Sequence, residues 1–490
     1  LRVERLLSGR KTLRDFRPAH GRAGRFKSSL DPGLESVLLP ERVSGDTHPA
    51  RAVRRALRLS PNEQLDGVSL IKRLDAQQRF VSTSRVAIDP FIRRAHDAGE
   101  DLATLKDLAS RLHDADLAER FEANDKNGLT HYAPFPFDCQ LFYRARVDRV
   151  DGRDLTREEM DTAQSFGDAA RKLRQRLGMS DFLPYFAVLR ADGDHMGAAI
   201  GELTRTQKGA AIGELTRIQQ HQLFSNELLG FARRADDTVR QHSGALIYSG
   251  GDDVLAFLPL DTAIPCAERL RLIFADVMRG ALPDVAEAAL PTLSVGIAIG
   301  HYAEHLQNLL RWSVAAERAA KKPRNALAIA LHTRTSGETA LTVPPRPWSA
   351  TPPPAQRWRD WIDLHDGDHL PDSAAYELRT LFLELDGVRL TRASDLADLV
   401  RRETRRILMR KRADAGRRDV DKAVRETVER LIGDDLKRLG EVVSELIIAR
   451  RLADAVRAGA GTALARWDEV TTRRVPVSPA NGEGHLRSRA

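Results

Sequence analysis

Two short apolar runs on either side of a glycine- and aspartate-rich turn constrain this chain more than any other feature. Residues 245–248 (Ala-Leu-Ile-Tyr) and 254–258 (Val-Leu-Ala-Phe-Leu) flank Ser249-Gly-Gly-Asp-Asp253. Such a pattern is typical of a β-hairpin. Paired glycines permit positive φ angles and let a ligand approach the backbone. The sequence therefore predicts a tight hairpin whose turn carries two carboxylates, Asp252 and Asp253.

A second acidic turn follows another apolar run further upstream. Residues 185–189 (Tyr-Phe-Ala-Val-Leu) lead to Asp192-Gly193-Asp194, and a helical pattern then extends to about residue 242. We expect a buried strand that ends at Asp192 and lies beside the hairpin. Two-metal phosphoryl transfer needs carboxylates that converge from neighbouring strands, so that one cation activates a hydroxyl and the other screens the leaving pyrophosphate. Asp192, Asp252 and Asp253 are therefore expected to bind two Mg²⁺ or Mn²⁺ ions.

Each acidic turn also has a purely structural explanation. Glycine and aspartate are favoured in hairpin turns, and Asp-Gly-Asp after a strand can cap a helix. Both turns occur together, however, and apolar strands lie on the correct sides of each. This combination favours one shared active site.

The order of the remaining patterns predicts the fold class. Further strands are expected at 293–299 and 326–330, with helical patterns between successive strands. Strand, helix, hairpin, helix, strand, helix, strand is a ferredoxin-like order with additions. Helical spacing of apolar residues dominates on both sides of this region. We therefore expect an α+β chain in which a ferredoxin-like domain is flanked by two mainly helical domains.

Changes in composition divide the chain into five segments. Six prolines between residues 344 and 354 indicate a linker, and the last residues have no core-forming pattern. The expected segments are a mainly helical domain with an irregular start at 1–178, the ferredoxin-like domain at 179–338, a proline-rich linker at 339–357, a helical domain at 358–472 and a disordered tail at 473–490.

Composition narrows the class of protein. Two cysteines, Cys139 and Cys266, are too few for a disulfide framework or a four-cysteine zinc site. Neither a signal peptide nor an apolar run of about 18 residues is found, so we expect a cytoplasmic protein without a membrane contact. The net charge of +8 suits contact with nucleic acid, although arginine-rich composition alone gives the same excess.

The acidic motifs belong to a longer series of segments that resembles one family. Phe186-Ala-Val-Leu-Arg-Ala-Asp-Gly-Asp-His-Met-Gly197 and Gly244-Ala-Leu-Ile-Tyr-Ser-Gly-Gly-Asp-Asp-Val-Leu-Ala-Phe-Leu-Pro259 look like the second palm domain of the large subunit of type III CRISPR effector complexes, closest to the Cmr (type III-B) branch. Further similar segments are 63–74, 80–87, 134–138, 293–299, 315–322, 324–329 and 336–338. The ferredoxin-like domain would then be a palm of the nucleotidyl cyclase and polymerase type.

The resemblance implies a nucleotidyltransferase. In that family two palm domains face each other and bind two ATP molecules, and the complex uses CRISPR RNA to bind a target RNA. The palm site then joins ATP into cyclic oligoadenylates, by attack of a 3′-hydroxyl on an α-phosphate. Carried over by position, Asp192 and Asp253 would be metal ligands with Asp252 beside them. The nucleotide-binding residues would be Gly193, Ser225, Gly250, Gly251, Ser294, Lys321 and Lys322.

Several of these positions have simpler explanations. Ser225 and Ser294 can equally be small core or capping residues. A lysine pair at 321 and 322 also suits a solvated helix end. The arginine-rich stretch 401–418 could contact an RNA backbone without reading bases, or could form a solvated face paired with acids.

This chain also departs from the family pattern. The family often carries an N-terminal HD nuclease, but the His-Asp dipeptides here, at residues 96, 113 and 365, are isolated, and we expect them on the surface. The cysteine cluster that binds zinc in the family is absent. No first palm is found, so a second palm would be supplied by another polypeptide or lost by truncation.

Two alternative functions remain open at this stage. A free-standing diguanylate-cyclase-like enzyme also carries a Gly-Gly-acid-acid hairpin and a later Ala-Lys…Arg-Asn run. Against it, the fourth hairpin position is Asp253 followed by valine. The other alternative is a catalytically inactive structural subunit of the ribonucleoprotein.

Overall fold

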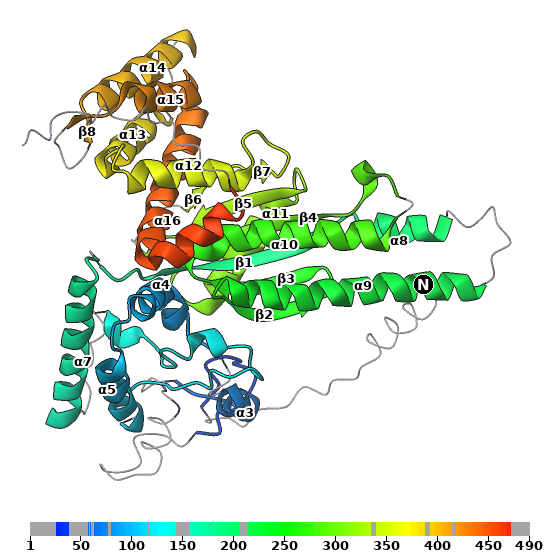
Figure 1. The fold of residues 1–490 in the computed structure, drawn as a ribbon, viewed down its shortest axis with the longest axis vertical. Helices are drawn as coiled ribbons and strands as arrows, with labels where there is room; N and C mark the ends of the chain where they lie inside the picture. Colours follow the sequence, from blue (N-terminus) through cyan, green and yellow to red (C-terminus); the bar gives the residue numbers. More distant parts are fainter. Residues whose placement is uncertain are drawn as a thin grey trace, which may run out of the picture. The chain divides into compact units, whose positions relative to one another are not determined.

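The computed structural model describes most of the chain (Figure 1). The described residues are 26–38, 57, 59, 63–76, 80–115, 117–143, 156–179, 181–205, 214–283, 285–334, 340–387, 393–413 and 418–471. The chain divides into two compact units. One comprises residues 1–80 and 110–122, and the other comprises residues 81–109 and 123–490. The expected tail at 473–490 lies outside the described residues.

Helices dominate the chain before the sheet, as the apolar spacing predicts. They are α3 (Gly67–Ala76), α4 (Thr83–Asp97), α5 (Ala103–Asp114) and α7 (Arg157–Arg176), with 3₁₀ turns η2 (Thr130–Tyr132) and η3 (Gln140–Phe142). Their ends follow capping rules. Thr156 and Glu159 form a reciprocal capping box at the start of α7, and Ser82 accepts the Arg85 N–H at the start of α4.

A mixed sheet of seven strands forms the centre of the larger unit. Its order is β2-β3-β1-β4-β5-β6, and β7 also pairs with β5. The strands are β1 (Tyr185–Asp194), β2 (Ala245–Gly250), β3 (Asp253–Leu258), β4 (Thr292–His301), β5 (Ala326–Leu331), β6 (Leu341–Thr342) and β7 (Arg346–Pro347). The first four pair antiparallel in the order β2-β3-β1-β4, and β5 joins β4 in parallel. This is the predicted ferredoxin-like order with an added β4-α-β5 unit, so the α+β prediction is confirmed.

Helices cover both faces of this sheet. The connections are α8 (Met196–Arg205), α9 (Glu214–Gln241), α10 (Leu260–Ala281), η4 (Glu287–Ala289) and α11 (Leu306–Ala320). Ala187, Leu189 and Ala191 of β1 share a buried core with Phe231 of α9 and Phe274 of α10. Alternate residues of β1 face α11 instead, because side chains alternate across a strand. Figure 1 shows α9 and α10 lying side by side.

One glycine lets α11 approach the sheet closely. Any side chain at Gly296 on β4 would overlap the backbone nitrogen of Glu317 in α11. The helix can therefore pack directly on the strand only because residue 296 has no Cβ. This contact places the end of α11 at the end of β1, where the acidic residues lie.

The proline-rich segment expected as a linker also contributes to the sheet. Its residues form β6 and β7, and the Trp348 side chain is buried and donates from Nε1 to the Leu293 carbonyl at 3.1 Å. After it follow α12 (Pro354–Asp366), α13 (Asp372–Leu385), α14 (Ala393–Met409), β8 (Arg412–Ala413), β9 (Arg418–Asp419), α15 (Lys422–Ile432) and α16 (Leu436–Asp468).

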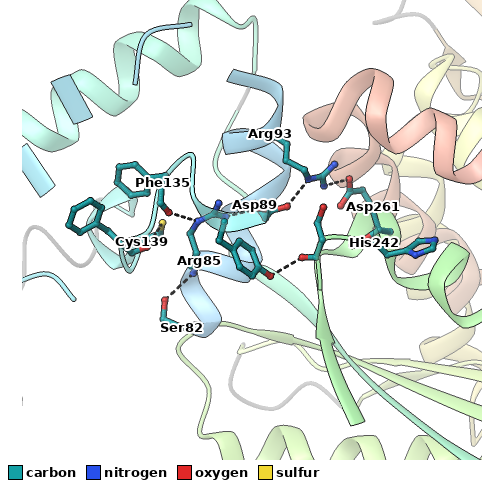
Figure 2. A network of polar contacts seen from close by, with 12 residues as sticks. Ser82, Arg85, Asp89, Arg93, Phe135, Cys139, His242 and Asp261 are labelled. Carbon is teal, nitrogen blue, oxygen red and sulfur yellow. Dashed lines mark hydrogen bonds and ion pairs between the residues drawn. The ribbon is translucent and has the colours of Figure 1, made fainter. Parts of the chain in front are cut away.

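A buried network of charges joins three of these helices (Figure 2). In α4, Asp89 accepts from Arg85 and from Arg93, each at 2.6 Å. Arg93 also donates to Asp261 in the first turn of α10 at 2.6 Å. Trp467 of α16 donates to the Asp261 carbonyl at 2.8 Å. Both carboxylates are fully enclosed, so this network fixes α4 and α16 against the helix that directly follows β3.

One surface prediction is wrong. His365 is 2 % exposed, and its Nε2 contacts the Leu446 carbonyl at 3.1 Å, so this His-Asp dipeptide packs inside the C-terminal helices. His96 is exposed as expected. Among the described residues, no helix combines the length and apolar character needed to cross a bilayer.

Candidate active site

The register of the sheet brings two of the predicted carboxylates together. Asp192 lies opposite Ser294 in the β1–β4 ladder, on the face that α11 covers. On the other side of β1, Ala191 pairs with Val254, so the next position places Asp253 beside Asp192. Val254 belongs to the core under α9 and α10, and alternation therefore turns Asp253 to the same face as Asp192.

Asp252 lies apart from that pair. A Cβ atom at Gly193 would be 2.6 Å from Asp252 Oδ2 and 2.9 Å from Met196 Cγ, so the Asp252 side chain covers Gly193. Gly193 faces the α9 and α10 side of the sheet, opposite to Asp192. Burial, and more weakly the neighbouring Asp253, raise the pKa of Asp252. Gly193 thus leaves room for Asp252 rather than for a phosphate.

The hairpin turn has the backbone expected of its glycines. Gly251 has a φ of 78°, a conformation that favours glycine, and open space surrounds it. Gly250 lies under the Tyr248 ring, whose side chain a Cβ at 250 would displace. The space beside the Cα atom is therefore free at Gly251 and filled by Tyr248 at Gly250.

Of the two predicted lysines, Lys321 points into the site and Lys322 does not. Lys321 forms an ion pair with Asp192 and donates to the Gly193 carbonyl at 3.1 Å. Burial and the charge of Arg324 lower its pKa, while the ion pair with Asp192 favours the charged form. Because Lys321 Nζ contacts the Asp192 carboxylate directly, we assign Lys321 as the charged ammonium form. Lys322 is exposed.

The two predicted serines differ in accessibility. Ser294 is enclosed, and its hydroxyl donates to Asp194 at 2.8 Å. The Ser294 side chain therefore holds the Asp194 carboxylate and is itself buried. Ser225 is exposed on α9, where it lines an open hollow with His221, Gln222 and Asn226.

Asp194 is the residue that sequence reasoning passed over. It is 2 % exposed, it shares the α11 face with Asp192, and its carboxylate accepts from Thr292 at 2.9 Å and from the Asn325 N–H at 2.9 Å. The alternation of Asp192-Gly-Asp194 was the available signal, because it places both acids on one face. Glu317 of α11 lies against the same face of the sheet. Burial raises the pKa of Glu317 above its ordinary value, while Arg190 opposes this shift and Asp253 adds to it.

The Asp192 and Asp253 side chains have the carboxylate oxygens that a divalent cation such as Mg²⁺ prefers. Mg²⁺ is commonly held by one or two carboxylates, with waters and substrate phosphates completing its coordination. Lys321 already shares Asp192, so a cation there would compete with this ion pair. Within the part of the chain that the structure describes, no three His, Cys, Asp or Glu side chains converge closely enough to hold an ion by themselves.

Comparison with known families identifies the domain that contains this site. Residues 185–328 match the family model "Cas10/Cmr2, second palm domain". This part of the chain is therefore similar to a Cas10/Cmr2 palm domain. Every predicted site residue, from Asp192 to Lys322, lies within the matched range.

Two curated relatives match parts of the chain. The Cmr subunit Cmr2 of Pyrococcus furiosus is 35% identical over 141 residues, covering 26% of this chain and 16% of that protein. Cmr2 of Saccharolobus solfataricus is 33% identical over 84 residues, covering 14% of this chain and 8% of that protein. The matched regions thus span less than a fifth of each relative.

Solved structures give a broader but more distant match. A type III-B Cmr-beta complex in the apo state contains a chain with 14% identity and a TM-score of 0.47, over 91% of this chain and 60% of that one. The same complex bound to cognate target RNA gives 13% identity and a TM-score of 0.48, over 88% and 58%. The guanylyl cyclase Cya2 has 13% identity and a TM-score of 0.20, over 30% and 74%.

Proposed function

We propose that this chain is a palm-bearing subunit of a type III-B CRISPR effector complex and that its palm converts ATP to cyclic oligoadenylate when target RNA binds. The observation that carries the proposal is the register of β1 and β3, in which the Ala191 and Val254 pair puts Asp192 and Asp253 at adjacent positions, together with the ion pair between Asp192 and Lys321 at the end of α11. Both aspartates lie within the range that matches the Cas10/Cmr2 palm. The relatives that match it are named as Cmr2 subunits.

Each residue of the site would have its own role in nucleotidyl transfer. A new bond forms between a 3′-oxygen and the α-phosphorus, while the bond to the leaving pyrophosphate breaks. Bound divalent cations would supply activation of the hydroxyl and charge screening of pyrophosphate. Asp192 and Asp253 would hold those cations, and the open backbone at Gly251 would admit phosphate oxygens. Lys321 would exchange its carboxylate partner for the triphosphate as the nucleotide binds.

A second palm domain completes the proposed site. Among the described residues, the palm offers the Asp192 and Asp253 carboxylates and an open hollow beside Ser225. Joining nucleotides needs two ATP molecules held together with their reacting groups aligned. We therefore propose that a second palm, in the same natural polypeptide or in a partner, supplies the other nucleotide. Other type III subunits, CRISPR RNA and target RNA would be the remaining partners.

The C-terminal helices offer a surface for RNA. Arg402, Arg405 and Arg410 are exposed, and none of them forms an ion pair with an acid that the structure describes. Arg401, by contrast, pairs with Asp434 at 2.8 Å. Guanidinium groups without an acidic partner, on α14 and directly after it, suit contact with an RNA backbone, which would be sensitive to salt.

Substitution of the carboxylate pair tests the proposal. The double variant Asp192→Asn and Asp253→Asn, assembled with its neighbouring subunits, guide and target RNA, should lose pyrophosphate release and still bind target RNA. The matched control is Asp276→Ala on α10, an exposed acid paired only with Arg279. Full activity of the double variant would refute the assignment. Absence of product with wild-type protein would favour the inactive structural subunit.

A further inference from the structure

The Asp194 carboxylate is enclosed and is held by donors from the protein itself. Its side chain is 0% exposed. Oδ1 accepts from Ser294, and Oδ2 accepts from Ser294, Thr292 and the Asn325 N–H, at 2.8–3.0 Å. The Ser294 hydroxyl has one proton to share between the two oxygens, so three donors reach this carboxylate, and Lys321 Nζ lies 3.9 Å from Oδ1. Asp194 is thus enclosed and held by protein donors, although it lies two residues from Asp192 on the same face.

The contact with Asn325 holds an unfavourable backbone conformation in place. Arg324 and Asn325 both have positive φ angles, 60° and 45°, and they form the turn between α11 and β5. Left-handed conformations cost free energy in residues other than glycine and persist only where the surroundings hold them. Asp194 supplies that hold through a buried, charge-assisted hydrogen bond to the turn.

The same turn places the positive charges of the site. Lys321, the first residue after α11, begins this Lys321–Asn325 turn and reaches Asp192 and the Gly193 carbonyl. Arg324, within it, contacts His195 Nε2 at 2.8 Å. Because a guanidinium can only donate, the imidazole nitrogen accepts in this contact. His195 itself has a φ of 60° and directly follows Asp194. Residues with positive φ angles therefore lie at both ends of the Asp194–Asn325 hydrogen bond: His195 next to Asp194, and Arg324 and Asn325 in the turn.

We propose that Asp194 is a positioning residue for phosphate binding: it locks the Lys321–Asn325 turn so that Lys321 and Arg324 face the phosphates of a bound nucleotide. The inference rests on the proposed function, since it assigns the phosphate-binding part of the same site. Asp194 acts through Asn325 and touches neither metal nor nucleotide. Its loss should therefore weaken triphosphate binding and leave binding of a divalent cation unchanged.

Binding of inorganic tripolyphosphate and of Mn²⁺ to the full chain separates these roles. Asp194→Ala should raise the Kd for tripolyphosphate about tenfold or more, the usual effect of losing a hydrogen bond to a buried charge. Mn²⁺ affinity, measured by electron paramagnetic resonance, should stay within about twofold. Asp194→Asn should recover most of the affinity, because its amide oxygen can still accept the Asn325 N–H. Asp276→Ala is the matched control.

Two variants at the turn keep the inference testable if Asp194→Ala does not fold. Asn325→Gly retains the N–H and favours positive φ, so it should bind tripolyphosphate like wild type. Asn325→Val places a β-branched residue in the left-handed region and should weaken binding as Asp194→Ala does. Equal affinity of Asn325→Val and wild type would overturn the inference, as would loss of Mn²⁺ binding in Asp194→Asn.

The result also distinguishes the two proposals. Wild-type protein that binds tripolyphosphate but makes no oligoadenylate would contradict the proposed function and leave the role of Asp194 standing. Wild-type protein that binds no tripolyphosphate would overturn the role of Asp194.

Discussion

Replacing Asp89 by alanine should destabilise the larger unit much more than removing an exposed carboxylate does. Arg85 and Arg93 share this carboxylate, and the exposed fractions of the Arg85, Arg93 and Asp89 side chains are 1%, 13% and 1%. Both arginines hold the pKa of Asp89 below its ordinary value against the opposing effect of burial. The variant would leave two enclosed guanidinium groups short of one partner.

The loss of unfolding free energy in Asp89→Ala depends on which contacts each arginine retains. Arg85 retains the Phe135 carbonyl at 2.9 Å and the Tyr132 ring, and Arg93 retains Asp261. Removing one partner of a buried pair costs about 3–5 kcal/mol, and the retained contacts place Asp89→Ala within that range. Asp276→Ala breaks an exposed ion pair on α10 and should cost less than about 1 kcal/mol.

Urea unfolding monitored by circular dichroism measures both free energies. A double-mutant cycle between Asp89→Ala and Arg93→Met then isolates the coupling between the two groups. The combined variant should be less destabilised than the sum of the single variants, because it removes one of the unpaired charges. If Asp89→Ala costs no more than Asp276→Ala, the network does not hold α4 to the rest of the unit.

Three further predictions concern packing and pH. A Cβ at Gly193 would clash with Asp252 and shift the hairpin turn that also carries Asp253, so Gly193→Ala should lower any nucleotidyl transfer about tenfold. Gly197→Ala, whose Cβ would meet nothing within 4 Å, should leave the steady-state rate unchanged. Gly296→Ala should cost about 1–3 kcal/mol in thermal unfolding because α11 must move, and Gly280→Ala on α10, with open space around it, should have no such cost. Burial lowers the pKa of His131 and His242 to about 4, so the unfolded chain binds more protons between that value and about 6.5. Stability should therefore fall as pH drops through this window, and His242→Phe should reduce the slope; an unchanged slope would contradict burial of a neutral His242.

The strands and their order could be predicted because their signals are local. Apolar runs at 185–189, 245–248, 254–258, 293–299 and 326–330 each became a strand, and glycine marked the hairpin turn. β6 and β7 were not predicted, since two-residue strands next to prolines have no periodicity. Their position depends on pairing with β5 and on burial of Trp348.

Parts of the site depend on contacts too distant in sequence to be predicted. Asp194 meets Ser294 and Asn325, which lie 100 and 131 residues away, so its burial could not be inferred from its neighbours. His365 meets Leu446, 81 residues away, which is why a surface position was wrongly expected. The direction of Asp252 depends on turn geometry and on the missing Cβ of Gly193.

Nucleotide selectivity in the presence of RNA is the most direct test of the central claim. The chain, with and without its neighbouring subunits, guide and target RNA, is incubated with labelled ATP or GTP and Mg²⁺ or Mn²⁺, and products and pyrophosphate are quantified. The account predicts oligoadenylate and pyrophosphate from ATP only when target RNA is present. Product from GTP in the absence of RNA would contradict it and would identify a diguanylate-cyclase-like enzyme instead.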